Sequence, residues 1–244
     1  MDLVIDLGNT NKKLALFKKG KLFRLKQYPF FNLEILRDFV ENNTLIDRCI
    51  LASVVSYPRS VQNFLAQRFR FLEFTELTPV PVINLYRSKS TLGKDRLAAA
   101  VAAAGRFPGK DVLVINAGTC ITYDLVNARK EYLGGGISPG IHMRLEALHT
   151  FTGKLPLIRI KKIETLIGNT TERSILSGVL NGVVAETGGI AERYREQFPQ
   201  LVTVLSGGDA KYFDKRLKIS IFALPNIVIH GLYKILDFNV IKAK

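Results

Sequence analysis

The sequence predicts an α/β fold built from two similar domains. A short apolar strand, Leu3 to Leu7, runs through the turn Asp6-Leu-Gly-Asn-Thr10 into a second strand. The same order returns about half a chain later, where the strand Val112 to Ile115 runs through Asn116-Ala-Gly-Thr119 into another strand. Helical patterns follow in both halves, and one of them opens with Gly93-Lys-Asp-Arg96. This recurrence of strand, turn and strand suggests a duplicated domain.

The first half continues as a β-meander through Lys13 to Phe17 and Lys21 to Gln27. Helical and strand-like patterns then alternate: helices at 33–42 and 59–69, a strand at 49–55, strand-like segments toward 83, a loop at 86–91 and an alanine-rich helix at 95–105. Phe107-Pro-Gly109 is the strongest boundary signal. We therefore expect one domain at residues 1–108 and a second at residues 109–244.

The second half repeats this order with strands at 112–115, 120–126 and 130–133. The glycine run Gly134 to Gly140 follows, and we expect it to form a connector or a loop that permits close approach of a substrate or backbone. Helices at 141–150 and 171–197, a strand at 201–205, the turn Ser206-Gly-Gly-Asp209, a strand at 219–222 and a last helix at 226–236 complete the pattern.

Composition indicates a globular protein that can bury an ordinary core, because 47% of the 244 residues are hydrophobic. No apolar run approaches the roughly 20 residues of a membrane span, and the N-terminal segment carries Asp2 and Asp6. We expect a soluble, cytoplasmic protein with no membrane partner. Cys49 and Cys120 lie in apolar strand-like stretches, which favours reduced core thiols over a disulfide or zinc site.

The chain is strongly basic, with 35 Lys and Arg against 21 Asp and Glu and a net charge of +14. Such a charge favours polyanions, including nucleotide phosphates. The basic residues, however, form short scattered clusters such as Lys12-Lys13 and Lys18-Lys19, without interleaved aromatic residues. A solvated basic surface explains this pattern better than a nucleic-acid groove, so nucleic acid is not expected as a partner.

The Asp6 turn has the composition of a phosphate site. Gly8 allows close backbone approach, Thr10 offers a hydroxyl group, Asp6 can bind Mg²⁺ and Lys13 supplies positive charge. An ordinary hairpin turn has similar residues. The recurrence of the pattern at Asn116-Ala-Gly-Thr119 favours phosphate binding at both turns.

Gly93-Lys-Asp-Arg96 lies where a loop becomes a helix, so the helix dipole favours the ionised form of Asp95. Such a carboxylate can orient an alcohol and accept its proton during phosphoryl transfer. Arg96 can bind a carboxylate or phosphate through two hydrogen bonds. A plain helix cap beside a surface arginine remains the alternative from these residues alone.

The chain combines several motifs that occur together in one family. They are Asp6-x-Gly-Asn-Thr10, Gly93-x-Asp-Arg96, Asn116-x-Gly-Thr119-Cys-x-Thr122-x-Asp124, Gly134-Gly-Gly-Ile-x-Pro-Gly140, and Gly168-Asn-Thr-Thr171 followed by Ser177-Gly178. In this order, which covers essentially the whole chain, they resemble the type III pantothenate kinases. The resemblance implies the duplicated two-domain fold of the actin-like sugar-kinase superfamily, with ribonuclease H-like domains of mixed sheets flanked by helices and an active site in the cleft between the domains.

The same resemblance implies ATP-dependent phosphorylation of pantothenate to 4'-phosphopantothenate, the first step of coenzyme A biosynthesis, by a homodimer whose interface lies near the substrate site. Asp95 would be the catalytic base and Asp6 would hold Mg²⁺. ATP would bind Asp6, Gly8, Asn9, Thr10, Lys13, Gly118 and Thr119. Pantothenate would bind Tyr86, Gly93, Lys94, Asp95, Arg96 and Thr171.

One position departs from the family pattern. Asn116 stands where the family normally has an aspartate that binds a monovalent cation, K⁺ or NH₄⁺. An amide offers a neutral oxygen instead of a charged carboxylate, so we expect a weaker or altered cation requirement.

Two other functions remain open at this point. Proteins with this sequence pattern have been described as transcription accessory factors, and the charge of +14 makes polyanion binding plausible. A kinase of the same fold that phosphorylates another small alcohol is the second alternative, because a fold does not fix its substrate. Retention of Asp6, Asp95 and Arg96 together favours the kinase.

Overall fold

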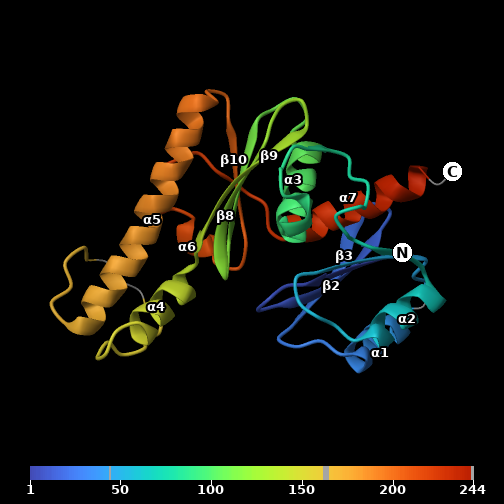
Figure 1. Ribbon diagram of the computed structural model, residues 1–244, viewed down its shortest axis with the longest axis horizontal. Coiled ribbons are helices and arrows are strands. Elements are labelled where there is room, and N and C mark those ends of the chain that lie inside the picture. The colour runs from blue at the N-terminus through green and yellow to red at the C-terminus, as the bar shows by residue number, and fades with distance from the viewer. Residues whose placement is uncertain (44, 162–164, 243–244) are drawn as a thin grey trace. The chain divides into compact units, whose positions relative to one another are not determined.

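The structure is a computed structural model that describes residues 1–43, 45–161 and 165–242 (Figure 1). Its residues divide into two compact units. Unit 1 comprises residues 1–109, 126–133 and 226–244, and unit 2 comprises residues 110–125 and 134–225. The units do not follow chain order, since the last helix belongs to unit 1 with the N-terminal half. The domain boundary expected at residue 108 stays a prediction.

Unit 1 is built on a five-stranded mixed sheet with the order β3-β2-β1-β4-β5. β1 pairs antiparallel with β2 and parallel with β4, because β1 and β2 form a hairpin whereas a helical crossover leads to β4. The strands are β1 (Asp2–Leu7), β2 (Lys12–Lys18), β3 (Lys21–Tyr28), β4 (Arg48–Ser53) and β5 (Arg70–Glu73).

Helices cover both faces of this sheet, as Figure 1 shows. α1 (Leu33–Glu41) and α2 (Arg59–Arg68) lie on one face, where alternate strand residues such as Leu3, Ile5 and Leu16 form a buried core with Leu36 and Leu65. Because side chains of a strand alternate between faces, the residues between them point to the opposite side.

That opposite side carries α7 (Ile227–Lys242). The ring of Phe17 stacks on Tyr233 with centroids 4.2 Å apart and meets His230 edge-on at 5.6 Å. Burial raises the pKa of Tyr233, with Asp237 and Asp2 acting in the same direction. The C-terminal helix is therefore a core element of the unit that contains the N-terminus.

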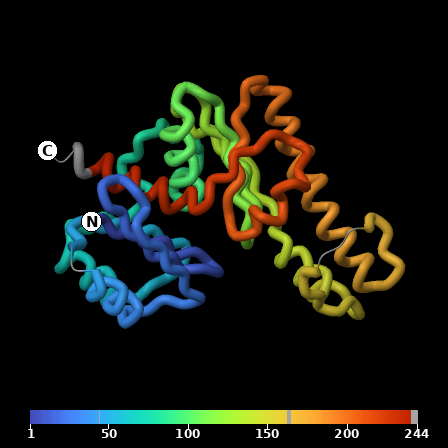
Figure 2. Tube along the Cα trace, turned by 180° about the vertical axis from the view of Figure 1, so that it is seen from behind, coloured from blue at the N-terminus to red at the C-terminus, as the bar shows by residue number. Residues whose placement is uncertain are grey.

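α7 packs on the alanine-rich helix α3 (Lys94–Arg106), and the two helices lie together in both views (Figures 1 and 2). Alanines 98–100 and 102–104 of α3 are buried. At Gly231 the helices approach so closely that an added Cβ atom would lie 1.8 Å from the carbonyl oxygen of Ala98. Small side chains on α3 and a glycine on α7 thus permit direct backbone contact.

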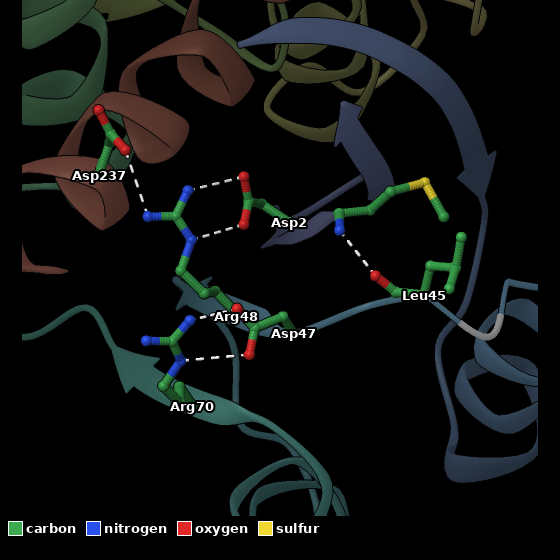
Figure 3. Close-up of polar contacts among 7 residues, drawn as sticks. Asp2, Leu45, Asp47, Arg48, Arg70 and Asp237 are labelled. Atoms are coloured by element: carbon green, nitrogen blue, oxygen red, sulfur yellow. Dashed lines mark hydrogen bonds and ion pairs between the residues drawn. The ribbon is translucent and has the colours of Figure 1, made fainter. Parts of the chain in front are cut away.

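An ion-pair network fastens the same helix to the sheet (Figure 3). Arg48 on β4 donates two hydrogen bonds to the carboxylate of Asp2, at 2.6 and 2.8 Å, and a third to Asp237 of α7 at 3.2 Å. The hydrogen bonds to Asp2 are the main cause of a raised pKa of Arg48. A bidentate pair of this kind is more directional than a single contact. β1, β4 and α7 are therefore joined at one point.

Unit 2 contains a sheet with the order β11-β10-β7-β8-β9, which corresponds strand for strand to the order in unit 1. β10 pairs parallel with β7 and with β11. The strands are β7 (Val112–Ala117), β8 (Cys120–Val126), β9 (Glu131–Pro139), β10 (Val202–Ser206) and β11 (Phe222–Ala223). At its start, within unit 1, β9 pairs with β6 (Ile83–Asn84). The repeated order confirms the predicted duplicated α/β fold.

The glycine run forms part of strand β9 rather than the expected connector or loop. Gly135 has a φ of +156°, and an added Cβ atom would lie 1.6 Å from the carbonyl oxygen of Tyr123. The glycines therefore allow two backbones to approach within the sheet, a requirement that only the partner strand reveals.

α4 (Ile141–Thr150), α5 (Thr171–Gln197) and the short helix α6 (Ala210–Phe213) pack against one face of this sheet, as the unit's ribbon shows in Figure 1. Among the described helices, α5 alone has the length and hydropathy of a membrane span. Its buried residues, including Leu180 and Val183, belong to the core of unit 2. Its apolar character is thus that of a core helix.

Most predicted elements occur within two residues of their expected bounds. The short elements α6 and the 3₁₀ turn Lys89–Thr91 were missed, whereas β5 lies within the strand-like segments predicted toward residue 83. The last predicted strand is shorter, at Phe222–Ala223, and α7 extends to Lys242. Short elements depend on pairing with distant residues and give little local periodicity.

The contact at Gly231 provides a test of the α3–α7 packing. We predict that Gly231→Ala lowers the free energy of unfolding by about 1–3 kcal/mol, because the new methyl group collides with the Ala98 carbonyl and separates the helices. Chemical denaturation measures this loss. Gly189→Ala on α5, where no atom lies within 4 Å of the new Cβ, is the control and should be neutral or stabilising. Equal effects of both changes would contradict the close packing.

Candidate active site

The Asp6 turn joins β1 and β2 in unit 1. Asp6 pairs across the hairpin with Lys13. The Gly8 N–H donates to the carbonyl of Asn11 at 3.1 Å, and Lys12 Nζ donates to the carbonyl of Asn9 at 2.8 Å. A Cβ atom at Gly8 would lie 3.0 Å from the Asn11 oxygen, so the turn favours glycine there. The result is a tight turn whose tip, from Asn9 to Asn11, is exposed.

The carboxyl group of Asp6 lies in an environment that disfavours its charge. Burial raises the pKa of Asp6 to about 7, Lys13 opposes the shift and the nearby Asp95 carboxylate adds to it. Asp6 and Asp95, from distant parts of the sequence, are therefore close enough within unit 1 for their negative charges to repel each other. Such pairs are typical of sites that bind a cation or handle protons.

Lys13 also contacts the beginning of α7. Its Nζ atom donates a hydrogen bond to Oδ1 of Asn226 at 3.3 Å. Asn226 has a φ of +57°, in the left-handed region that asparagine tolerates better than most residues. Residue 226 is where the sequence predicts the start of the last helix, but nothing in the local pattern indicates the contact of Asn226 with Lys13.

Asp95 lies in the first turn of α3, two residues after the N-cap residue Gly93. A Cβ atom at Gly93 would lie only 2.6 Å from Oδ1 of Asp95. The carboxylate therefore folds back over the helix N-terminus, in space that glycine leaves open. The partial positive charge of the helix end favours its ionised form.

Arg96 is 5% exposed, so the expectation of a surface arginine does not apply. Its guanidinium carbon lies 5.7 Å from the centroid of the Tyr86 ring, within the range of a cation–π contact. The centroid of the Tyr86 ring lies 6.2 Å from that of Tyr132, and the backbone N–H of Tyr86 donates to Oδ1 of Asn84 at 3.0 Å. A buried arginine beside a fixed aromatic ring suits recognition of an anionic group.

The second turn, in unit 2, is held by two glycine contacts. Gly140 N–H donates to the Thr119 carbonyl at 3.0 Å, and a Cβ atom at Gly140 would lie 2.0 Å from the Gly118 carbonyl oxygen. Gly207 has a φ of +99°, and its Cβ atom would lie 2.0 Å from the Ala117 oxygen. The turns at Gly140 and Gly207 are thus packed against the β7–β8 turn, while Thr119 itself is exposed.

Asn116 occupies the strand end before this turn and pairs in register with Ser206 on β10. Beyond Ser206, the N–H of Asp209 donates to the Ala117 carbonyl at 3.0 Å. Burial raises the pKa of Asp209, and the nearby His142 acts in the opposite direction. Asn116 and Asp209 thus lie on the same edge of the unit 2 sheet.

Thr171 begins α5 and lines a broad surface groove of about 1210 Å³ in unit 2. The neighbouring Thr170 caps the helix by accepting a hydrogen bond from the Arg173 N–H at 3.2 Å. Polar and apolar residues share the groove, among them Arg144, Phe151 and Ser174.

Unit 1 brings together one group of the predicted site residues. It consists of Asp6, Gly8, Asn9, Thr10 and Lys13 of the first hairpin, together with Tyr86, Gly93, Lys94, Asp95 and Arg96. Unit 2 holds the others, Asn116, Gly118, Thr119 and Thr171. The roles assigned to them by resemblance stay predictions.

The unit 1 residues fit a divalent cation held jointly with a nucleotide. In the described part of the chain, no cluster of three or more histidine, cysteine, aspartate or glutamate side chains has the arrangement of a metal site. Mg²⁺ commonly needs only one or two protein carboxylates, because substrate phosphates and waters complete its coordination. Asp6, with Asp95 close enough to raise its pKa, meets that requirement.

The fold is shared with known phosphotransferases. A glucokinase from an Antarctic psychrotroph matches with a TM-score of 0.52 and 14% identity, over 97% of this chain and 98% of the other. A Campylobacter jejuni protein described as a Baf family transcriptional activator matches with a TM-score of 0.61 and 19% identity, over 98% of both chains. At these identities the likeness concerns the fold alone. The molecule therefore has the fold of the actin-like sugar kinases, as expected.

Sequence relatives define the family. The type III pantothenate kinase profile matches residues 2–193. A type III pantothenate kinase from Christiangramia forsetii is 44% identical over 98% of this chain and 99% of its own length, and one from Phocaeicola vulgatus is 43% identical with the same coverage. The chain belongs to the type III pantothenate kinase family, which confirms the resemblance read from the motifs.

The electrostatic cost at Asp6 leads to a stability prediction. Its pKa is about 7 in the folded chain and near 3.8 when unfolded, so the folded state binds the extra proton between these values and loses stability as pH rises through them. In EDTA, Asp6→Asn should therefore raise the free energy of unfolding at pH 8 by about 1–3 kcal/mol.

Denaturation of both proteins across pH 4 to pH 8 measures this difference. The advantage of the variant should be smallest at pH 4 and reach its full value above pH 7. A difference that does not vary with pH would mean that Asp6 carries no buried-charge penalty.

Proposed function

We propose that the protein transfers the γ-phosphoryl group of ATP to the primary hydroxyl of pantothenate, giving 4'-phosphopantothenate and ADP in the first step of coenzyme A biosynthesis. Family membership supports the activity. The observation that supports the site assignment best is the position of Asp95 at the N-terminus of α3, in space kept open by Gly93 and close enough to Asp6 to raise its pKa.

Asp95 is the catalytic base in this proposal. The hydroxyl oxygen of pantothenate forms a bond to the γ-phosphorus while the bond to the β–γ bridging oxygen breaks and ADP leaves. The hydroxyl proton passes to the Asp95 carboxylate late in the step, because the transition state of phosphoryl transfer is loose. Until then the carboxylate chiefly orients the hydroxyl group.

Arg96 and Tyr86 recognise the acid end of pantothenate. The substrate carries a carboxylate, which a guanidinium group binds through two hydrogen bonds. The burial of Arg96 beside the Tyr86 ring supports this role, since a fixed and weakly hydrated guanidinium loses little freedom on binding. Gly93, Lys94 and Thr171 complete the substrate contacts.

The two hairpin turns hold ATP. The contacts in unit 1 come from Asp6, Gly8, Asn9, Thr10 and Lys13, and those in unit 2 from Gly118 and Thr119. The exposed tip of the first turn and the positive charge of Lys13 support phosphate binding there. Asp6 would hold Mg²⁺, which neutralises phosphate charge when bound. The positive charge of the metal would favour ionised Asp6 in the loaded enzyme, whereas the phosphates alone would oppose it.

A homodimer completes the account. Several large hydrophobic residues of unit 2 are exposed, among them Phe151, Leu166 and Ile167, and Phe151 reaches 85% exposure. Phe151 also lines the groove that contains Thr171. Large exposed apolar side chains next to a proposed substrate-binding residue support an interface with a second copy of the chain. We place the enzyme in the cytoplasm, where ATP and pantothenate meet.

The kinase is favoured over a transcription accessory factor. The fold shared with the Campylobacter jejuni protein is compatible with either function. A regulator has no need for the costly Asp6 carboxylate, the Asp95 helix terminus and the buried Arg96 in one unit. A kinase acting on a different small alcohol would retain these residues, and substrate specificity separates that alternative.

The first test is ADP release coupled to a spectroscopic assay, with pantothenate, ATP, Mg²⁺ and K⁺. The wild-type protein should release ADP only when pantothenate is present. Asp95→Asn should lower kcat by about 10²–10⁴-fold, because the amide cannot accept the proton. Turnover that survives in the variant would show that another group acts as the base.

Gly93 should matter for catalysis more than for folding. Gly93→Ala places a methyl group where the Asp95 carboxylate lies, and this flexible side chain can move away at little cost in stability. We expect kcat to fall about tenfold, while the free energy of unfolding changes by about 1 kcal/mol or less. Parallel kinetics and denaturation separate the two effects. An unchanged kcat would mean that the position of the carboxylate is not critical.

The Asn116 position allows a test of cation dependence. A carboxylate binds a monovalent cation more strongly than an amide does, so Asn116→Asp should raise activity most at low K⁺. The K⁺ concentration for half-maximal activity should fall about tenfold. A titration of activity against KCl at constant ionic strength measures it, with NH₄⁺ as a second cation. An unchanged titration curve would refute the assignment of Asn116.

A further inference from the structure

The guanidinium group of Arg144, on helix α4, is partly exposed but donates hydrogen bonds to three other residues. Its Nε donates to the Pro139 carbonyl at 2.8 Å. Its Nη2 donates to Ser138 Oγ at 2.8 Å and to Glu186 Oε2 at 2.6 Å. One guanidinium group therefore connects the end of β9, helix α4 and the middle of helix α5, all within unit 2.

The segment that Arg144 holds is the one that packs against the β7–β8 turn. Pro139 precedes Gly140, whose N–H donates to the Thr119 carbonyl at 3.0 Å. The lack of room at Gly140 means that a shift of this segment has to move Gly118 and Thr119 as well. A displacement of Arg144 therefore displaces the β7–β8 turn through direct contacts.

Glu186 holds the guanidinium group of Arg144 in place through an ion pair. The side chains of Arg144 and Glu186 are 22% and 30% exposed, so solvent screens their attraction less than it screens a fully exposed pair. Burial alone would raise the pKa of Glu186, but hydrogen bonds from Ser138 and Arg144 outweigh it and lower the pKa. The carboxylate thus stays charged near neutral pH and keeps the guanidinium in place.

We propose that Arg144, anchored by Glu186, is a positioning residue that sets the Thr119 turn for the phosphates of ATP. This inference rests on the proposed binding of ATP at Thr119. Arg144 reaches the turn only through Pro139 and Gly140, so it acts without touching the nucleotide. Its loss should weaken ATP binding more than pantothenate binding or folding.

The test compares Arg144→Lys with Arg195→Lys. Lysine keeps the charge but cannot donate from the same fork of nitrogens, so it cannot hold Pro139, Ser138 and Glu186 together. The control residue Arg195 forms an ion pair with Glu192, three residues earlier on α5, at 2.9 Å. This pair does not contact the β7–β8 turn. Both variants thus exchange the same residue types.

Steady-state kinetics, the affinity for a non-hydrolysable ATP analogue by calorimetry, and thermal unfolding are measured for both. Arg144→Lys should raise the KM for ATP and the Kd of the analogue about tenfold, and change the KM for pantothenate less than twofold. Arg195→Lys should match the wild type. Glu186→Gln keeps an oxygen acceptor and should fall between the two, whereas Glu186→Ala should resemble Arg144→Lys.

The proposal is overturned if Arg144→Lys leaves the analogue affinity unchanged, or if both KM values and kcat change only in proportion to lost folded protein. Should Arg144→Lys fail to fold, Glu186→Ala decides by the same criteria. A wild-type protein that binds the analogue but does not phosphorylate pantothenate would refute the proposed function, and the analogue affinities would still decide the role of Arg144.

Discussion

The packing of α7 on α3 is the constraint on which the arrangement of unit 1 depends. It requires backbone contact between Gly231 and Ala98, and the alanine run of α3 makes that contact possible. α3 carries Asp95 and Arg96 at its N-terminal end. A helix from the C-terminus of the chain therefore holds in place the helix that carries the proposed catalytic base.

The same helix also reaches the first hairpin. Asn226, directly before the helix, accepts a hydrogen bond from Lys13 of the hairpin, and Asp237 toward its end accepts one from Arg48 of β4. Between them, Tyr233 stacks on Phe17 of β2, a contact worth roughly 0.5–1.5 kcal/mol beyond the area that it buries. The separation of the Asp6 turn from Asp95 is consequently fixed by packing on both sides of α7, and not by either loop alone.

The charges at this site oppose folding. Asp6 and Asp95 raise each other's electrostatic energy, and Lys13 offsets only part of the penalty. A protein selected only for stability would replace one of the acids by a neutral residue. When a metal ion binds, its positive charge would remove the electrostatic penalty of the two carboxylates. Occupation of the site is therefore linked to the stability of unit 1.

The sequence alone predicted the order of elements and the duplicated sheet, because both depend on local patterns. Short apolar runs joined by a turn that contains asparagine and glycine mark β1 and β2, and the same pattern marks β7 and β8. The position of Asp6 near a strand end, and of Asp95 and Arg96 in the first turn of a helix, was also predictable from the local pattern. The burial of Arg96 was not, and the chemical roles of the three residues stay predictions.

Contacts between distant segments were beyond prediction from local pattern. Lys13 and Asn226 are 213 positions apart, and nothing near either residue indicates the other. The glycine run was expected to be a connector or loop, because nothing in its own sequence shows why a strand needs glycine there. The reason is the Tyr123 carbonyl on the neighbouring strand, which leaves no room for a side chain at Gly135. Nothing near Arg144 in the sequence indicates its bond to Glu186, because that residue of helix α5 lies 42 positions further along the chain.

A crystal structure of the enzyme with pantothenate, Mg²⁺ and a non-hydrolysable ATP analogue tests the central claim most directly. The account predicts the primary hydroxyl of pantothenate about 3 Å from the Asp95 carboxylate, with Asp6 facing the nucleotide phosphates on the same side. A pantothenate hydroxyl directed at another residue, or a nucleotide bound away from the Asp6 turn, would contradict it.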